Sequence, residues 1–103
     1  PIKDTDGKHK YKVLTKSKDG KTTKTVHFGA VSYGDYTLYC KNFGRDYADK
    51  MKMSYIARHS NQNEDWNDPM TAGYWSRFLL WNKPTIDASY KDIKIYLKKK
   101  GYT

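Results

Sequence analysis

The sequence predicts a single small α+β domain, in which an N-terminal β-hairpin packs on about three helices. Two stretches that alternate in polarity around an Asp-Gly turn predict the hairpin. Apolar residues spaced three and four apart predict the helices. With 103 residues, of which 37% are hydrophobic and 16% aromatic, the chain has material for one core, built largely from rings.

The hairpin is predicted by residues 10–15, KYKVLT, and residues 21–28, KTTKTVHF. The first stretch alternates along a strand, and the second is rich in β-branched residues. Between them stands SKDG, in which Gly20 accepts the positive φ that a tight turn needs. The polar residues 1–9 before it predict a flexible N-terminus, so that the domain occupies residues 10–103.

The middle of the chain predicts a loop and then a helix. Gly29 and Gly34 interrupt the stretch after the hairpin, which favours a loop with a short third strand near residues 36–39. A helix is predicted over residues 45–59, where an apolar stripe with a period of four contains Tyr47, Met51, Tyr55 and His59, flanked by Ala48 and Ser54. The polar residues that follow predict a second loop.

The segment TAGYWSRFLLWNKP, residues 71–84, is the most aromatic part of this hydrophilic chain. It predicts a helix over residues 70–82, capped by Asp68 or Thr71 and ended before Pro84. Rings on two faces indicate a central, buried helix, although an interface role for part of it stays open. The candidate core or interface aromatics are Trp66, Tyr74, Trp75, Phe78 and Trp81.

A last helix is predicted over residues 86–99. Thr85 is placed to cap it, and Gly101 is placed to end it. Its apolar stripe consists of Ile86, Tyr90, Ile93 and Leu97. Lysines gather in its last turn, where the helix dipole favours positive charge.

The net charge of +9 is concentrated at the two ends of the chain. Most of the basic residues are lysines, which bind phosphates as point charges and favour loose polyanion binding over base recognition. The alternative is a solvated lysine surface that keeps the protein soluble. The candidate polyanion-binding residues are Lys8, Lys10, Lys12, Lys16, Lys18, Lys21 and Lys24 in the hairpin region, with Lys94, Lys98, Lys99 and Lys100 near the other end.

Motifs for catalysis and for cofactors are weak in this sequence. His59 precedes Glu64, Asp65 and Asp68, but no established metal-ligand spacing accompanies them, and an imidazole there also suits a helix C-terminus. Cys40 is the only cysteine, and no partner base marks it as a nucleophile. We therefore expect no enzyme activity, no metal or other cofactor and no small-molecule substrate. No apolar run is long enough to predict membrane insertion.

Several motifs resemble a family of short proteins of large and giant double-stranded DNA viruses, a domain of unknown function. The resemblance spans residues 24–95 and is carried by HFGA at 27–30, YGDYT at 33–37, YIARH at 55–59, NEDWND at 63–68 and TAGYWSRFLLWNKPT at 71–85. The last motif is the longest and the most specific. The resemblance implies a viral origin and brings no catalytic residues with it.

Two classes of function follow from the charge and from this resemblance. The first is a non-enzymatic structural protein of a virus particle, a minor capsid or internal protein whose basic surface contacts acidic partner proteins. Such a protein would be made in the cytoplasm or nucleus of the host cell and end in the virion. The second is a sequence-independent nucleic-acid-binding protein that neutralises or packages DNA.

Overall fold

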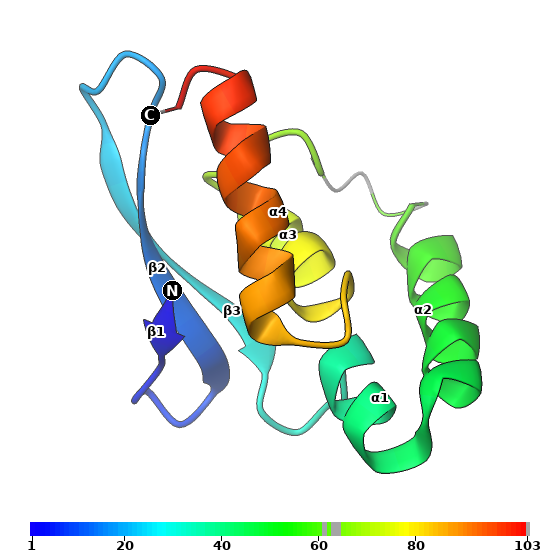
Figure 1. The fold of residues 1–103 in the computed structure, drawn as a ribbon. Coiled ribbons are helices and arrows are strands. Elements are labelled where there is room, and N and C mark those ends of the chain that lie inside the picture. Colours follow the sequence, from blue (N-terminus) through cyan, green and yellow to red (C-terminus); the bar gives the residue numbers. More distant parts are fainter. Residues whose placement is uncertain (61, 63–64, 103) are drawn as a thin grey trace.

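The computed structural model describes residues 1–60, 62 and 65–102 and shows an α+β domain, as predicted (Figure 1). A three-stranded antiparallel sheet comes first in the chain, and helices follow it. The elements are β1 (Ile2–Lys3), β2 (His9–Lys16), β3 (Thr23–Ala30), α1 (Tyr36–Phe43), α2 (Arg45–His59), α3 (Ala72–Trp75), the π-helical turn η1 (Ser76–Leu80) and α4 (Ile86–Lys99).

The predicted hairpin is confirmed as β2 and β3, which pair in antiparallel register from His9 opposite Ala30 to Lys16 opposite Thr23. Gly20 has the expected positive φ, of 74°. The structure adds β1, which pairs with β2 and makes the strand order β1-β2-β3. Flexibility of residues 1–9 stays a prediction, but part of this segment lies along the sheet.

The predicted loop with a short strand near residues 36–39 is wrong, because these residues belong to α1. The cause is local: the Asp35 side chain accepts a hydrogen bond from the backbone N–H of Leu38, at 3.0 Å, and so caps a new helix. Gly44, with a φ of 88°, separates α1 from α2. The aromatic and β-branched residues here resemble a strand, but the cap decides the outcome.

Helix α2 has the predicted bounds, but its apolar stripe is only partly right. Tyr55 and Ala48 are buried, whereas Tyr47 is 43% exposed. Met51 and His59 are half-buried. The helix therefore turns its Ala48–Tyr55 side toward the core, and Tyr47 lies at the margin.

The helix predicted over residues 70–82 is shorter and less regular than expected. Thr71 caps α3, and after one turn the chain continues as η1, in which the N–H of Trp81 reaches the carbonyl of Ser76, at 3.2 Å. This wider turn shifts the phase of the side chains that follow. As a result Leu79, Leu80 and Trp81 are all buried, while Phe78 is only half-buried.

The segment of α3 and η1 forms the centre of the core, as its aromatic content predicted. It contacts β3 on one side and α4 on the other. The ring of Trp75 lies 5.9 Å from that of Phe28, and Trp81 stacks on Tyr55 at 4.4 Å. The predicted stripe of α4 packs on the same core, with Ile93 fully buried.

Gly29 is a position where only glycine fits, so Gly29→Ala should destabilise the fold by about 2–4 kcal/mol. Its φ is +76°, and an added Cβ would lie 2.6 Å from Cδ1 of Leu80, a buried side chain. The measurement is the free energy of unfolding in urea. Gly20→Ala is the control, because Gly20 has a φ of +74° and a Cβ there would meet only Lys16, at 3.5 Å. Equal losses of unfolding free energy in the two variants would show that the clash with Leu80 adds nothing to the backbone strain.

Candidate nucleic-acid interface

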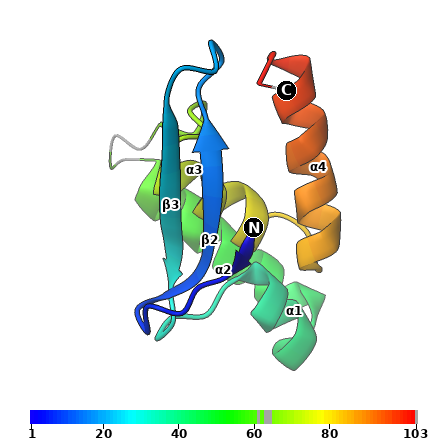
Figure 2. The same cartoon turned by 90° about the vertical axis from the view of Figure 1, so that its left-hand side faces the viewer.

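The two lysine-rich parts of the chain meet at one end of the molecule. The ammonium of Lys18, in the hairpin turn, lies 5.4 Å from the ring centroid of Tyr102, just beyond α4. Both views show the turn between β2 and β3 beside the last turn of α4 (Figures 1 and 2). We call this region the basic end. Its lysines, all exposed, are Lys16, Lys18, Lys21, Lys24, Lys98, Lys99 and Lys100.

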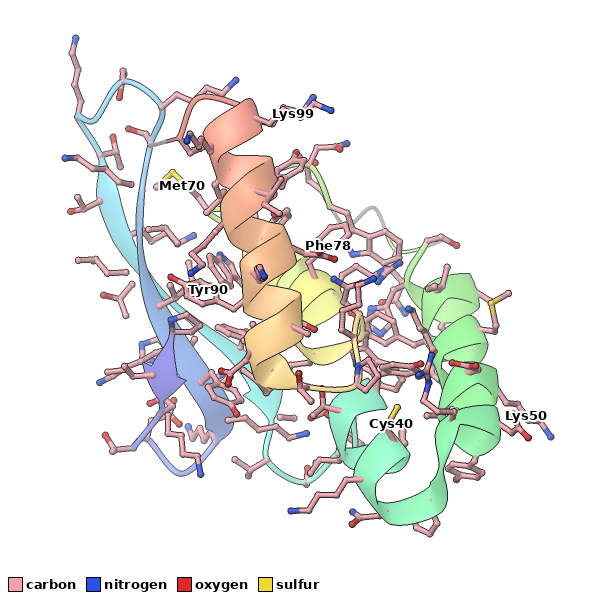
Figure 3. All side chains as sticks on the ribbon, in the orientation of Figure 1. Cys40, Lys50, Met70, Phe78, Tyr90 and Lys99 are labelled. Carbon is pink, nitrogen blue, oxygen red and sulfur yellow. The ribbon has the colours of Figure 1, made fainter. Side chains whose placement is uncertain are left out.

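The end of α4 is built to return the chain toward the hairpin. Gly101 adopts a φ of 86° and donates its N–H to the carbonyl of Lys98, at 3.2 Å. The N–H of Tyr102 reaches back to the carbonyl of Leu97, at 2.8 Å. This is a Schellman motif, which glycine favours. It places the Tyr102 ring against Lys18 and leaves the lysines of the last turn on the surface, where Figure 3 labels Lys99.

The carboxylate of Asp19 is hydrogen-bonded within the hairpin turn. Asp19 accepts hydrogen bonds from the Ser17 hydroxyl, at 2.6 Å, and from the backbone N–H of Lys21, at 2.9 Å. These bonds, that from Ser17 first, hold the pKa of Asp19 below its ordinary value. Asp19 therefore fixes the turn that presents Lys18 and Lys21, and it forms no ion pair with either of them within the described residues.

Two further carboxylates lie near the basic end. Burial, followed by the charge of Asp68 and more weakly that of Asp65, raises the pKa of Tyr102. The C-terminus of α4 adds the negative end of a helix dipole. Lysines nevertheless outnumber carboxylates in this region, so the basic end keeps an excess of positive charge.

The remaining predicted lysines are placed elsewhere. Lys10 donates to the Asp35 carboxylate at 2.7 Å, and their side chains are only 14% and 4% exposed, so Lys10 supports the fold. Lys12 is the cross-strand partner of His27, away from the turn, and Lys8 is exposed in the loop before β2. The Lys94 ammonium lies over the ring of Tyr90, at 5.1 Å.

The candidate aromatics are chiefly core residues. Tyr74, Trp75 and Trp81 are buried, and Trp66 and Phe78 are half-buried. The guanidinium of Arg77 lies 5.5 Å from the Trp66 ring and 5.0 Å from that of Phe78. Burial lowers the pKa of Arg77, which donates to the carbonyl of Trp81 at 2.8 Å. The rings of Trp66 and Phe78 thus pack against Arg77 as part of the fold.

The two weak catalytic candidates, His59 and Cys40, lie in different surroundings. His59 stacks on Tyr55, at 4.2 Å between ring centroids, and Glu64 lies outside the described residues. Cys40 is half-buried, and the neighbouring Arg45 donates its Nε–H to Tyr36, at 3.1 Å. Burial, followed by hydrogen bonds with Asp49 and Cys40, raises the pKa of Tyr36 to about 12.

A cavity of about 670 Å³ opens between the end of β3, α1, α2 and α3. Tyr33, Tyr39 and Tyr55 line it with rings, and Arg58 and His59 supply cationic or polar groups. Its volume is in the range of small-ligand sites. The absence of a small-molecule substrate therefore stays a prediction.

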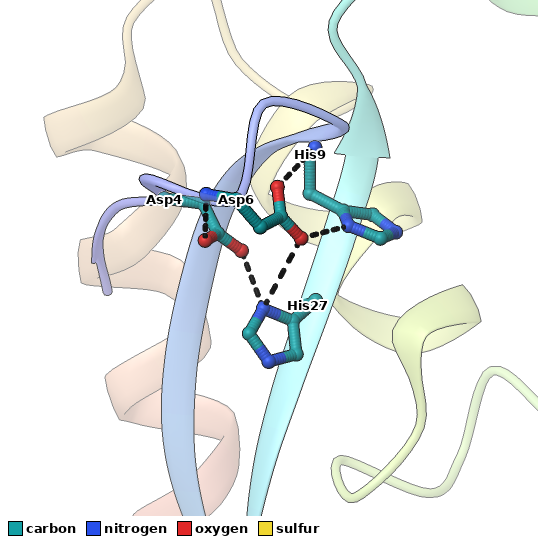
Figure 4. Close-up of side chains that lie close together, drawn as sticks. All are labelled: Asp4, Asp6, His9 and His27. Atoms are coloured by element: carbon teal, nitrogen blue, oxygen red, sulfur yellow. Dashed lines mark hydrogen bonds and ion pairs between the residues drawn. The ribbon is translucent and has the colours of Figure 1, made fainter.

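Sequence reasoning missed one group of potential metal ligands. Among the described residues, Asp4, Asp6, His9 and His27 place their ligand atoms within 4.8 Å of one another (Figure 4). Three of them stand within a short stretch, D-x-D-x-x-H, which was the available signal. His27 joins them only because β3 pairs with β2.

Comparisons with models of protein families, with curated proteins and with solved structures each found no match to this chain. The viral family that the sequence motifs resemble therefore stays a prediction. Within the described residues, no helix has the length and apolar character needed to cross a membrane.

Proposed function

We propose that this protein is a non-enzymatic, sequence-independent nucleic-acid-binding protein whose basic end contacts the phosphate backbone. The observation that supports this proposal is the contact of Lys18 with Tyr102, which joins two lysine clusters that are far apart in the sequence. The two clusters then act on one polyanion, and their contributions to binding add.

The composition of the basic end favours phosphate contacts over base recognition. Its cations are lysines, and each of the three arginines, Arg45, Arg58 and Arg77, lies outside it. Sequence readout in the major groove relies mainly on Arg, Asn and Gln side chains that form paired hydrogen bonds with base edges. We therefore expect duplexes of unrelated sequence to bind with similar affinity.

The test is the salt dependence of binding. A footprint of about 4–6 phosphates predicts that log affinity falls with log salt at a slope of about −4 to −5. Replacing Lys98, Lys99 and Lys100 together with alanine should flatten that slope by up to about 3. The measurement is fluorescence anisotropy on short duplexes between about 50 and 200 mM salt, with circular dichroism to check the fold.

The matched control removes the same charge elsewhere. Lys41, Lys50 and Lys91 are exposed on α1, α2 and the first half of α4, and Figure 3 labels Lys50 on α2. Replacing these three with alanine should change the slope much less. If both triple variants weaken binding equally, net charge alone drives it. Tight binding that is insensitive to salt and selective for sequence would contradict the proposal.

A second candidate is the structural role in a virus particle, and exposed apolar residues around the α1–α2 junction favour it. Phe43 is 64% exposed and Tyr47 is 43% exposed, with their ring centroids 5.0 Å apart. Leu38, earlier on α1, and Met53, further along α2, are also exposed. A protein partner is the usual occupant of such a surface. This role predicts no measurable DNA binding at about 150 mM salt and recovery of the protein in the proteome of purified virions.

A further inference from the structure

The geometry points to a Zn²⁺ site formed by Asp4, Asp6, His9 and His27 at the corner where the N-terminal segment crosses the sheet. This site is independent of the nucleic-acid-binding role proposed above. The ligands come from the segment between β1 and β2, from the first residue of β2 and from β3. A bound ion would therefore fasten the N-terminal segment to both long strands.

The donor atoms already converge in the structure. His9 Nδ1 lies 2.7 Å from Oδ2 of Asp6, and His27 Nδ1 lies 2.5 Å from Oδ2 of Asp4. His27 Nδ1 is also 3.7 Å from Oδ2 of Asp6. Figure 4 shows the His9 imidazole turned toward Asp6 and the His27 imidazole turned toward both carboxylates. One nitrogen from each histidine and one oxygen from each aspartate thus lie within 4.8 Å of one another.

These separations are close to those of a tetrahedral zinc site. Zn–N and Zn–O bonds of about 2.0–2.2 Å set neighbouring ligand atoms about 3.3–3.5 Å apart in a tetrahedron. The two hydrogen-bonded pairs would widen by about 1 Å or less as the ion replaces the shared proton. The pair formed by His27 and Asp6 would contract slightly, and ligand atoms as far as 4.8 Å apart would have to approach by about 1.4 Å.

Backbone hydrogen bonds hold each carboxylate in place by its other oxygen. Oδ1 of Asp6 accepts the N–H groups of Lys8 and His9, both at 2.8 Å, and Oδ1 of Asp4 accepts the N–H of Asp6, at 3.1 Å. In each case Oδ2 is left to face the imidazoles. Outer contacts of this kind orient metal ligands before the ion arrives. The Asp4 side chain is only 2% exposed, which limits its alternative positions.

Both carboxylates are anionic at neutral pH. The hydrogen bond with His9, reinforced by the backbone N–H groups, holds the pKa of Asp6 well below its ordinary value. Desolvation raises the pKa of Asp4, but the hydrogen bonds from His27 and from the backbone outweigh it, so that the pKa is lowered. With neutral imidazoles the cluster carries two negative charges, which a divalent ion neutralises.

The donor set favours a transition ion such as Zn²⁺ over Mg²⁺ and Ca²⁺. Two imidazole nitrogens with two carboxylate oxygens suit Zn²⁺, whereas Mg²⁺ and Ca²⁺ prefer oxygen ligands alone. The charged groups on the adjoining strands are lysines: Lys3 on β1, Lys8 in the connecting loop and Lys12 opposite His27.

The experiment titrates the full chain, without a histidine tag, with ZnCl₂ in an isothermal calorimeter at about pH 7.5. We expect one ion per chain and an affinity in the micromolar range or tighter. MgCl₂ and CaCl₂ should give no comparable signal. Melting of the Zn²⁺-loaded protein should shift to a higher temperature, because the ion binds only the folded arrangement.

Three variants decide whether these residues are the ligands. His27→Ala should lose more than about 100-fold in Zn²⁺ affinity, since even outer-shell changes cost 10–100-fold. Asp6→Asn keeps the shape of an exposed side chain, so it remains informative if His27→Ala folds poorly. His59→Ala is the control, because His59 stacks on Tyr55, away from this cluster. It should bind Zn²⁺ like the wild type.

The inference is overturned by any of three results. The first is no binding by the wild-type chain at millimolar Zn²⁺. The second is unchanged affinity in a folded His27→Ala or Asp6→Asn variant. The third is an equal loss of affinity in His59→Ala. Any of these would leave the four residues as a hydrogen-bonded network without a metal.

Discussion

Replacing Trp75 with alanine should lower the free energy of unfolding by about 3–5 kcal/mol, which is much of the stability of a domain this size. Trp75 is 3% exposed and lies between Phe28 on the sheet and Tyr90 on α4. Its indole N–H also donates to the buried carbonyl of Pro69, at 2.7 Å. Truncation therefore leaves a cavity and an unpaired backbone acceptor.

The measurement is urea denaturation followed by circular dichroism, with two comparisons. Trp75→Phe keeps a ring but removes the indole donor, so it should lose less than the alanine variant. Trp66→Ala removes the same kind of side chain from a half-buried position, so it should also lower the free energy of unfolding by less than Trp75→Ala does. Melting of Trp75→Ala close to that of the wild type would mean that the core does not depend on this ring.

The hairpin, α2 and α4 could be predicted because their signals are local. Asp19 and Gly20 specify the hairpin turn through their own hydrogen bonds and backbone conformation. Thr85 caps α4 by accepting the N–H of Ala88, at 3.2 Å, and Gly101 ends that helix. Each of these effects acts over a few residues, so the sequence alone contains it.

The errors in the predicted fold arise where a local pattern was ambiguous or where packing decided. Asp35 starts α1, but without the fold an aspartate after a glycine suits a loop equally well. The π-helical turn at residues 76–80 accompanies the burial of Leu79, Leu80 and Trp81, and no side-chain cap marks its start. Helical periodicity assumes a constant pitch and cannot detect such a turn.

The candidate interface was predictable in composition but not in geometry. The lysines were visible in the sequence, yet their assembly depends on the tertiary contact between Lys18 and Tyr102. The burial of Lys10 beside Asp35 is equally a product of tertiary structure. His27 joins Asp4 through strand pairing, so no spacing rule along the chain could have found the complete ligand group.

Asp35→Ala should destabilise the fold by about 3–5 kcal/mol, because Asp35 performs two tasks. Its carboxylate accepts a hydrogen bond from the Lys10 ammonium, at 2.7 Å, and the side chains of Lys10 and Asp35 are only 14% and 4% exposed. The same carboxylate also caps α1. Removing it leaves a largely buried lysine without its carboxylate, which costs more than the pair itself contributes. The measurement is again the free energy of unfolding in urea.

Two further variants separate the buried charge from the helix cap. Asp35→Ala combined with Lys10→Met removes the unpaired Lys10 charge as well. The double variant should therefore recover about half or more of the lost free energy of unfolding. Thr85→Ala removes only a cap, from α4, and should cost about 1 kcal/mol. If Asp35→Ala costs no more than Thr85→Ala, the cap accounts for its effect. A double variant no more stable than Asp35→Ala would show that the isolated Lys10 charge is not what destabilises it.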